Sequence, residues 1–275
     1  MKLKERFFTF YRIKIPNFRG KIRLGKMLML VLGFSIDPDT PIQARNNVSY
    51  YLPSLNDQIA IELFFLGVYE KEIIVFLAGQ IIDGDVFMDV GANIGSIAIP
   101  TVSVKKIKYH CFEASPTVYS YLKSNFSLNN LSSENLINGA VSNKSGSLIN
   151  FFDVSNERFG EGHISMQSDK NTIQIESICL DDYCFQNNID EIDWLKVDVQ
   201  GFEGLVFEGL NNMLSVGKVK NILFEFEEWA EKEAKFEIGY AKNIILKHGY
   251  QLKNIDGEKW TANHEKKNTM IWATL

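Results

Sequence analysis

The stretch VFMDVGANIGSIAIP (residues 86–100) decides the fold. An apolar run reaches Asp89 and then opens into a turn that contains Gly91, Asn93 and Gly95. Glycine has no Cβ atom, so it lets the backbone bend tightly and approach a ligand closely, and asparagine tolerates the same unusual angles. The pattern indicates a buried strand followed by a ligand-binding turn that opens a helix.

A second acid follows one strand–helix–strand step later. Glu113 ends the next apolar run, 24 residues after Asp89. The carboxyl ends of parallel strands are where open α/β sheets bind ligands, so both acids are expected at one site. A dinucleotide site uses G-x-G-x-x-G, whereas the spacing here is G-x-x-x-G with an acid two residues earlier. An adjacent carboxylate would repel a pyrophosphate, so the pattern favours S-adenosylmethionine over the alternative, an NAD-dependent oxidoreductase.

Beyond residue 86, short apolar runs alternate with longer amphipathic ones. Such alternation predicts an α/β fold with a doubly wound, mostly parallel sheet and helices on both faces. The last two apolar runs, YQLKNID and NTMIWATL, are joined by a short polar stretch that allows only antiparallel pairing. An antiparallel last strand is typical of the class I methyltransferase (Rossmann-like) fold.

Three segments carry more local predictions. Ser115 is expected to cap a helix that begins at Pro116, and residues 228–249 are expected to form one long helix. Residues 142–177, which interrupt the alternation, are expected to form an inserted hairpin or arm. The helix after Ser115 should bury a stripe formed by Val118, Tyr121, Leu122 and Phe126.

Charge is uneven along the chain. Residues 1–26 hold nine Lys or Arg and one acid, so this segment carries +8 and the remainder −13. Such a basic, aromatic-rich segment could lie on an anionic membrane surface, or it could be a solvated helical arm packed on the main domain. The apolar run over residues 27–34 is too short to span a bilayer, which needs about 20 residues.

The composition as a whole is that of a globular enzyme, with 45% hydrophobic residues and a net charge of −5. This charge argues against a nucleic-acid partner. Three cysteines, an odd number without zinc spacing, favour reduced thiols and a cytoplasmic location. If the basic segment binds lipid, the protein would be peripheral to the inner membrane face.

Five sequence blocks resemble those of the FkbM-type methyltransferases. They are GVYEKEIIVFL, GDVFMDVGANIGSIAI, FEASPTVYSYLKSNFSLNN, SICLDDY and DWLKVDVQGFEGLVFEGL. The resemblance covers roughly residues 60–275 and implies S-adenosylmethionine-dependent O-methylation, often of sugars or natural-product hydroxyls. We therefore expect a helical lead-in over residues 1–80 and a class I methyltransferase domain over residues 81–275. A non-catalytic adenosyl-binding or scaffold protein of glycan assembly is a further alternative.

The resemblance also implies site residues. Ala140 and Val141 would end the third strand, where related folds hold the adenine. Glu70, in the G-x-Y-E block, would fold over the methionine end of the cofactor or would be an acid on a helix surface. The remaining implied cofactor contacts are Asp89, Gly91, Asn93, Gly95 and Glu113.

The fourth predicted strand carries the candidate chemistry. Lys196 and Asp198 are two residues apart, so they face the same side of the strand. A neutral hydroxyl must lose its proton when it is methylated, and Asp198 is the candidate base, with an ion pair to Lys196 as the structural alternative. Asp198 with Glu225 or Glu227 could instead bind Mg²⁺ through oxygen ligands. His163, in the loop RFGEGHIS, is a candidate substrate contact or base.

Overall fold

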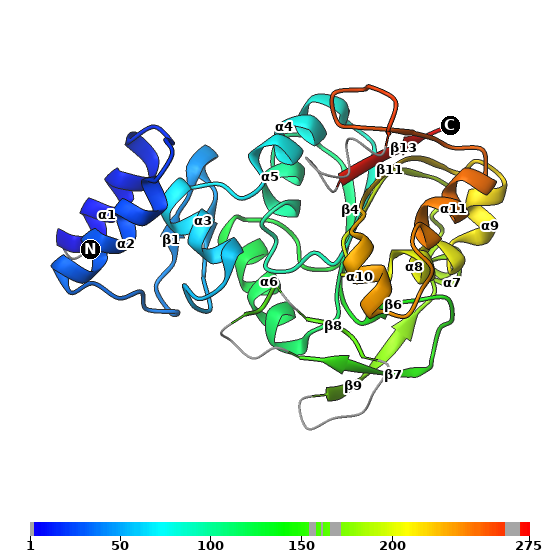
Figure 1. Cartoon of the computed structure of the whole chain (residues 1–275), viewed down its shortest axis with the longest axis horizontal. Coiled ribbons are helices and arrows are strands. Elements are labelled where there is room, and N and C mark those ends of the chain that lie inside the picture. The colour runs from blue at the N-terminus through cyan, green and yellow to red at the C-terminus, as the bar shows by residue number, and fades with distance from the viewer. Residues whose placement is uncertain (1–2, 154–157, 161, 166–171, 262–269) are drawn as a thin grey trace.

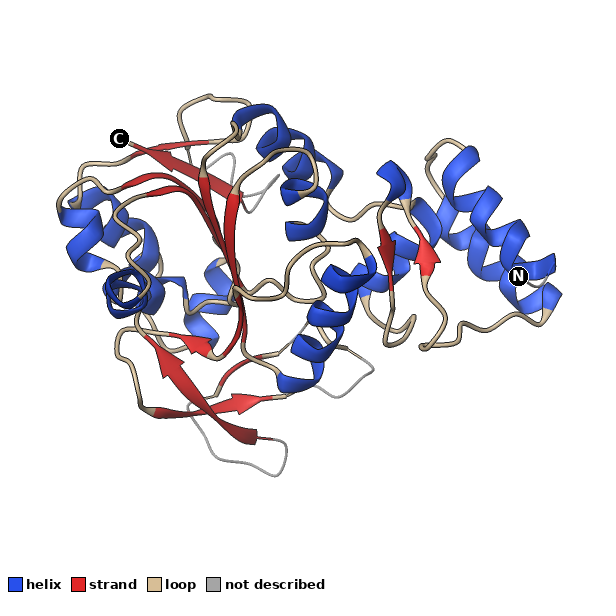
Figure 2. Ribbon diagram, turned by 180° about the vertical axis from the view of Figure 1, so that it is seen from behind, coloured by secondary structure: helices blue, strands red, loops and turns tan. Residues whose placement is uncertain are grey.

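The computed structural model describes residues 3–153, 158–160, 162–165, 172–261 and 270–275. Its centre is a seven-stranded sheet with the order β12-β13-β11-β10-β3-β4-β5 (Figures 1 and 2). The strands are β3 (Val86–Val90), β4 (Lys108–Glu113), β5 (Leu136–Asn138), β10 (Ile192–Val197), β11 (Val219–Glu225), β12 (Gln251–Lys253) and β13 (Met270–Thr274). β13 is antiparallel to both neighbours and the other pairs are parallel. This order confirms the predicted class I methyltransferase fold with a reversed last strand.

Helices cover both faces of this sheet. One face carries α4 (Lys71–Gln80), α5 (Ala98–Val102) and α6 (Pro116–Leu128). The other carries α7 (Leu180–Gln186), α8 (Glu203–Glu208), α9 (Asn211–Ser215) and α11 (Tyr240–Lys247). Because side chains alternate along a strand, Phe87 and Trp194 pack toward α4–α6 while Met88 and Leu195 pack toward the second helical layer.

Helix α6 begins as the sequence predicts. The Ser115 hydroxyl accepts a hydrogen bond from the backbone N–H of Val118 at 3.2 Å, and Pro116 occupies the first turn. The predicted stripe is only partly right, because Tyr121 is half-buried and Asn125 is fully buried. Asn125 is tolerated there because its amide bonds to backbone groups of two other segments.

The single helix predicted over residues 228–249 is wrong. The structure contains α10 (Glu228–Glu233) and α11, separated by a turn in which Lys235 and Gly239 have φ of 63° and 85°. The buried Glu231 carboxylate accepts hydrogen bonds from the N–H groups of Gly239 and Ala241 at 2.5 and 3.1 Å. These bonds satisfy orphan donors at the start of α11, so a second helix begins where periodicity alone suggests continuation.

A second sheet lies below the carboxyl edge of the first and has the order β6-β9-β7-β8 (Figure 2). Its strands are β6 (Ala140–Val141), β7 (Leu148–Phe152), β8 (His163–Ile164) and β9 (Thr172–Ile178). The expectation that Ala140 and Val141 end the third strand is therefore wrong. β5 stops at Asn138, whose amide donates to the carbonyl of Glu113, and the chain leaves the central sheet at Gly139.

The N-terminal helices α1 (Leu3–Lys14) and α2 (Lys21–Leu32) lie at one end of the molecule (Figure 1) and pack on α3 (Gln58–Leu66). Between them and α3 lie β1 (Ile42–Gln43), the 3₁₀ turn η1 (Arg45–Asn47) and β2 (Ser49–Tyr50). One hydrophobic cluster runs from these helices to the central sheet, and the division after residue 80 stays a prediction. No helix within the described ranges is long and apolar enough to cross a membrane.

Candidate active site

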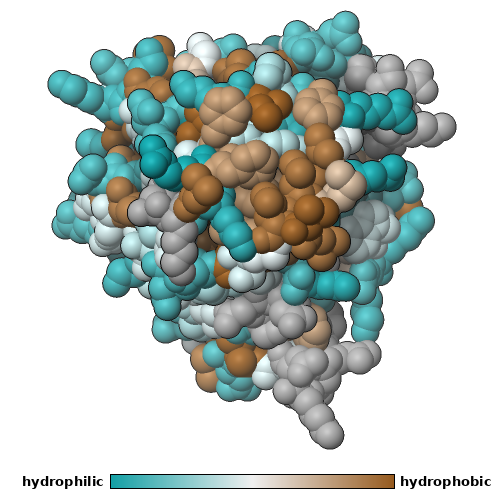
Figure 3. Space-filling view, turned by 90° about the vertical axis from the view of Figure 1, so that its left-hand side faces the viewer, coloured by the Kyte–Doolittle hydropathy of each residue, from teal (hydrophilic) through white to brown (hydrophobic). Residues whose placement is uncertain are grey.

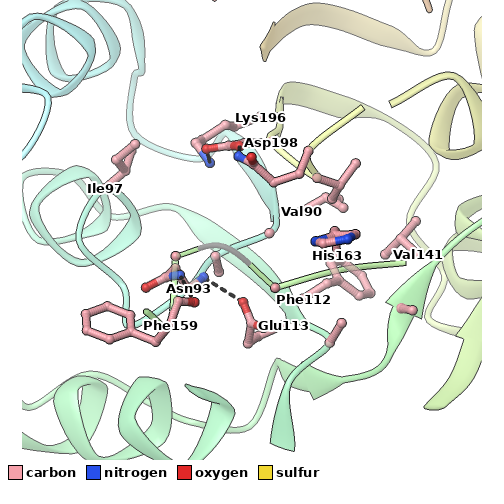
Figure 4. A pocket seen from close by; sticks show the side chains of 18 of the residues that line it. Val90, Asn93, Ile97, Phe112, Glu113, Val141, Phe159, His163, Lys196 and Asp198 are labelled. Carbon is pink, nitrogen blue, oxygen red and sulfur yellow. Dashed lines mark hydrogen bonds and ion pairs between the residues drawn. The ribbon is translucent and has the colours of Figure 1, made fainter. Parts of the chain in front are cut away.

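A pocket opens at the carboxyl ends of β3, β4 and β10, between the turn that follows β3 and the second sheet (Figure 4). It encloses about 880 Å³ of empty space, part of it open to solvent. The sequence-predicted residues that line it are Gly91, Asn93, Glu113, Ala140, Val141, His163, Lys196 and Asp198.

Gly91 is required by the close approach of two strands. Its φ is +78°, and a Cβ atom there would lie 1.9 Å from the carbonyl oxygen of Asp198. The approach arises because β3 and β10 are adjacent and the N–H of Asp198 donates to the carbonyl of Val90 at 3.0 Å. The turn is thus held directly against the end of β10, with no room for any side chain.

Gly95 lies outside the pocket. It also has a positive φ, of +85°, but a Cβ atom there would meet Ile99 at 2.7 Å and Leu122 at 3.2 Å. Its small size therefore allows the turn to pack against α5 and α6. The structure therefore gives Gly95 a packing role, and not the position at the pocket that a cofactor contact requires.

Glu113 faces the pocket from the end of β4. Its carboxylate accepts hydrogen bonds from the N–H of Asn93 at 2.9 Å and from the N–H of Ser115 at 2.8 Å (Figure 4). Burial nevertheless raises the pKa of Glu113 to about 7. Each carboxylate oxygen retains a second lone pair, which is the acceptor capacity that a pair of ribose hydroxyls requires.

Asn93 connects the turn to a loop of the second sheet. Its φ is 52°, and its side-chain N–H₂ donates to the carbonyl of Phe159 at 3.1 Å. The next residue of that loop, Gly160, donates its N–H to the Asp57 carboxylate at 2.9 Å. Phe159 is buried and lines the pocket, and sequence reasoning missed it because the loop RFGEGHIS was considered only for its histidine.

A buried charge cluster lies beside the pocket. Asp89 and Lys196 are register partners on β3 and β10, and Lys196 Nζ lies 3.1 Å from Asp89 Oδ1 and 3.6 Å from Asp198 Oδ2 (Figure 4). Asp89 is 0% exposed and does not line the pocket, so it lies behind Lys196 instead of meeting a ligand at the surface. The ion pair between Lys196 and Asp198 that the sequence offers as the structural alternative is therefore present, and Asp89 forms a second pair with the same lysine.

These charges support one another. Burial raises the pKa of Asp89, and the neighbouring Lys196 opposes that rise. Burial alone would lower the pKa of Lys196, but Asp89, Asp198 and Glu70 together raise it above its ordinary value. Lys196 is therefore a permanent cation placed between two carboxylates.

Gln200 and Glu225 complete the cluster around Asp198. The Gln200 side-chain N–H₂ lies 3.3 Å from Asp198 Oδ1 and 3.4 Å from Glu225 Oε2, and the φ of Gln200 is 56°. Burial and the charges of Asp198 and Glu227 raise the pKa of Glu225 well above its ordinary value, and a hydrogen bond to Asp198 acts in the same direction. The structure therefore places the Gln200 amide between the two acids.

The same arrangement does not fit a magnesium ion. Magnesium prefers several ionised or carbonyl oxygens around one point. Here the proposed ligands Asp198 and Glu225 both receive an N–H of the Gln200 amide. In the part of the chain that the structure describes, no three His, Cys, Asp or Glu residues are arranged to hold a metal.

Glu70 precedes the first turn of α4 with a φ of 41°. Burial and the charge of Asp198 raise the pKa of Glu70 to about 7, so it is not an ordinary acid on a helix surface. Its Oε2 atom and the Oδ2 atom of Asp89 are buried with no hydrogen-bond partner among the described residues. Buried carboxylate oxygens without partners are costly. Because Asp89 lies behind Lys196, the Glu70 atom is the one of the two that fits a cationic donor such as the ammonium of S-adenosylmethionine. The neighbouring Tyr69, which sequence reasoning also missed, lines the pocket.

His163 lies on β8 and faces the pocket opposite the Lys196–Asp198 pair (Figure 4). Its ring is 5.4 Å from that of Phe152, centroid to centroid, on the neighbouring strand β7. The histidine is therefore held on a strand, and its role as a substrate contact or base stays a prediction.

Comparisons with known proteins agree with this geometry. Residues 89–252 match the family described as the methyltransferase FkbM domain. Solved structures with a similar course of the chain include three methyltransferase-like proteins at low identity. A precorrin-6y C5,15-methyltransferase from Geobacter metallireducens is 10% identical, with a TM-score of 0.40 over 75% of this chain and 90% of that one. A TehB-like SAM-dependent methyltransferase from Corynebacterium glutamicum is 12% identical, with a TM-score of 0.42 over 77% and 90%.

The third, Aeropyrum pernix fibrillarin in complex with S-adenosyl-L-methionine, is 14% identical, with a TM-score of 0.40 over 74% of each chain. Curated protein sequences contain no match. The assignment therefore rests on the family match, which spans more than half of the chain, and on the chain's own strand order. The chain belongs to the FkbM family of methyltransferases and is a S-adenosylmethionine-dependent methyltransferase.

Proposed function

We propose that the protein methylates a hydroxyl group of a sugar, a glycan precursor or a related natural product. The observation that carries the proposal is the set of contacts that Asp198 makes. It lines the pocket, accepts a hydrogen bond from Gln200 and forms an ion pair with Lys196. A carboxylate so placed can remove the proton that a neutral alcohol must lose, which a nitrogen or thiolate acceptor does not require.

The cofactor would be held by residues on three sides of the pocket. Glu113 would accept hydrogen bonds from the ribose hydroxyls, and Ala140 with Val141 would pack on the adenine. Glu70 would supply a partner for the positively charged methionine end. When bound, S-adenosylmethionine supplies a methyl group on a sulfonium, which is already a strong electrophile.

The protein's own contribution is to hold and deprotonate the acceptor. Asp198 would accept the hydroxyl proton as the oxygen forms its bond to the methyl carbon and the carbon–sulfur bond breaks. Lys196, whose Nζ lies 3.6 Å from Asp198 Oδ2, would stabilise the negative charge of that carboxylate. Alignment of the oxygen at about 3–3.5 Å from the methyl carbon would account for much of the acceleration.

A sugar-like acceptor is supported by an aromatic residue near this acid pair. Trp229 is 56% exposed, and its indole N–H bonds to Glu227, whose own pKa is raised by burial and by the charge of Asp198. An exposed indole face beside several carboxylates can cover the apolar face of a sugar ring while the acids bind its hydroxyls. We also propose a cytoplasmic location, in keeping with the buried, unpaired Cys111, Cys179 and Cys184.

The test is methyl transfer from S-adenosylmethionine to a panel of sugars and nucleotide sugars, followed by mass spectrometry of the products. Asp198→Asn should lower the turnover by about 10²–10⁴-fold while cofactor binding changes little. Asp190→Asn, which changes an exposed acid before β10, is the matched control. Full activity of Asp198→Asn would contradict this assignment of the base. Cofactor binding without transfer to any acceptor would instead favour the non-catalytic alternative. In either case we expect no nucleic-acid partner, because the net charge is −5.

A further inference from the structure

The two N-terminal helices carry apolar side chains on their solvent-exposed side as well as on their buried side. On α1, Phe8 and Tyr11 are buried against the protein, while Leu3, Phe7 and Phe10 follow at helical spacing beside them and are exposed. A helix that only packed on the main domain would carry polar residues on this outer side. The exposed apolar stripe therefore needs an explanation of its own.

Helix α2 repeats the pattern. Gly25 faces inward, where a Cβ atom would meet the Phe65 ring at 2.3 Å, and the outer side carries Leu24, Met27, Leu30 and Val31. Leu30 is 83% exposed and Val31 is 76% exposed. Viewed from this end of the molecule, hydrophobic side chains gather in the middle of the face, with hydrophilic ones around them (Figure 3).

The two stripes belong to one surface. α1 and α2 both pack on α3, and the Tyr11 hydroxyl donates to the carbonyl of Lys21 at 2.6 Å. Lys4 Nζ donates to the carbonyl of Gly33 at 3.2 Å, so the start of α1 lies beside the end of α2 and the helices are antiparallel. We call this surface the outer face, and it is made of Leu3, Phe7, Phe10, Leu24, Met27, Leu30 and Val31.

Positive charge surrounds the outer face. The exposed cations of the hairpin are Lys4, Arg6, Lys14, Arg19, Arg23 and Lys26. Within the described ranges, none of these six forms an ion pair. The buried Arg12 and Lys21 bond to backbone carbonyls and to neutral Thr9 and Asn17 side chains, so no carboxylate neutralises them.

We propose that the outer face docks on an anionic lipid bilayer, with both helices lying in the interface plane. The apolar side chains would enter the boundary of the acyl region, and the surrounding Lys and Arg would contact lipid phosphates. Charge selects this occupant over a second copy of the chain, because a symmetric dimer through this face would bring two +8 segments together. The remainder of the protein, at −13, would be repelled by the same membrane and would stay in the aqueous phase.

The experiment is co-sedimentation of the full chain with vesicles of phosphatidylcholine alone and of phosphatidylcholine with phosphatidylglycerol. We expect binding to the anionic vesicles that is at least about tenfold tighter than to neutral ones and that weakens with added salt. Leu30→Ser/Val31→Ser and Arg23→Glu/Lys26→Glu should each weaken binding by about tenfold or more. Val75→Ser/Val216→Ser, which changes exposed valines of the main domain, is the matched control and should bind normally.

Thermal unfolding and cofactor binding of every variant show whether the fold survives, and these readouts do not depend on lipid. Equal binding to neutral and anionic vesicles, or wild-type binding by both hairpin variants, would overturn the proposal. A dimer in analytical ultracentrifugation that Leu30→Ser/Val31→Ser abolishes, without any vesicle binding by the wild type, would assign the outer face to a second copy instead.

Discussion

Glu113 is the residue whose protonation should control cofactor affinity. Its pKa in the folded protein is about 7 because it is buried, well above its ordinary value of 4.5. Ribose hydroxyls bind best to the ionised carboxylate, so affinity for S-adenosylhomocysteine should rise between about pH 6 and pH 8, by up to about tenfold per pH unit below the pKa. The apoprotein should show the opposite sign: the folded state holds this proton more tightly, so its stability falls as the pH rises from 4.5 to about 7.

Titration calorimetry across this pH range measures the effect. Burial raises the pKa of Glu70 to about 7 as well, so the comparison is best made in a Glu70→Gln background. There, Glu113→Gln should flatten the pH dependence and weaken binding by about 10–100-fold. Glu203→Gln is the matched control, because burial raises the pKa of Glu203 to about 7 but Glu203 does not itself line the pocket. An unchanged pH dependence in Glu113→Gln would exclude Glu113 as the titrating group.

At this scale the sequence predicts pocket residues wherever the decisive feature is local. Gly91, Asn93 and Glu113 directly follow or end strands, and a strand end fixes where such residues lie. Asp89 and Gly95 also lie at the end of a strand or in the turn that follows it, but they do not line the pocket. Asp89 pairs with Lys196, and Gly95 packs against α5. Their directions depend on a neighbouring strand and helix that are distant in sequence.

Pairing of β3 with β10 places one ion pair in the core. Lys196→Met should lower the free energy of unfolding by about 3–5 kcal/mol, because it leaves Asp89 buried without a cation. Asp89→Asn/Lys196→Met should recover much of this loss, since no buried charge then remains on β3. Urea denaturation measures both. Lys220→Met, which removes a half-exposed partner of Glu191 and Asp193, should cost about 1 kcal/mol or less. If the double variant is no more stable than Lys196→Met, the loss of stability in Lys196→Met does not come from an unpaired Asp89.

Elements themselves are predictable when hydrophobic periodicity and end signals agree. Ser115 and Pro116 mark the start of α6, and Gly67 marks the end of α3, with a φ of 76°. The break between α10 and α11 contains one such mark, Gly239, but a single glycine can also be tolerated inside a helix. The group that satisfies the start of the second helix is Glu231 from the first. The departure of the chain at Gly139 similarly depends on hydrogen bonds between Asn138 and the end of β4.

At the scale of the molecule, the order of strands can be predicted from the alternation of strands and helices and from the short connection before the last strand. The way in which the N-terminal part attaches to the sheet cannot be predicted in this way. Residues 49–51 are held by two amides of α6, Asn125 and Asn129, that bond to backbone groups of Ser49 and Tyr51. A helical sequence pattern places Asn125 on a buried face but cannot indicate which distant backbone it satisfies.

Asn125 therefore joins three parts of the protein, since its side-chain N–H₂ also donates to the carbonyl of Ile94 in the turn after β3 at 2.9 Å. Asn125→Leu keeps the branched shape of the side chain but leaves the N–H of Tyr51 and two carbonyls unsatisfied, so the free energy of unfolding should fall by about 3 kcal/mol or more. Cofactor affinity should fall too, because the turn that lines the pocket loses a support. Asn187→Leu is the matched control, since its exposed amide bonds only to the carbonyl of Tyr183 one turn earlier. If Asn125→Leu unfolds at the wild-type urea concentration, the hydrogen bonds of Asn125 do not stabilise the attachment of the N-terminal part.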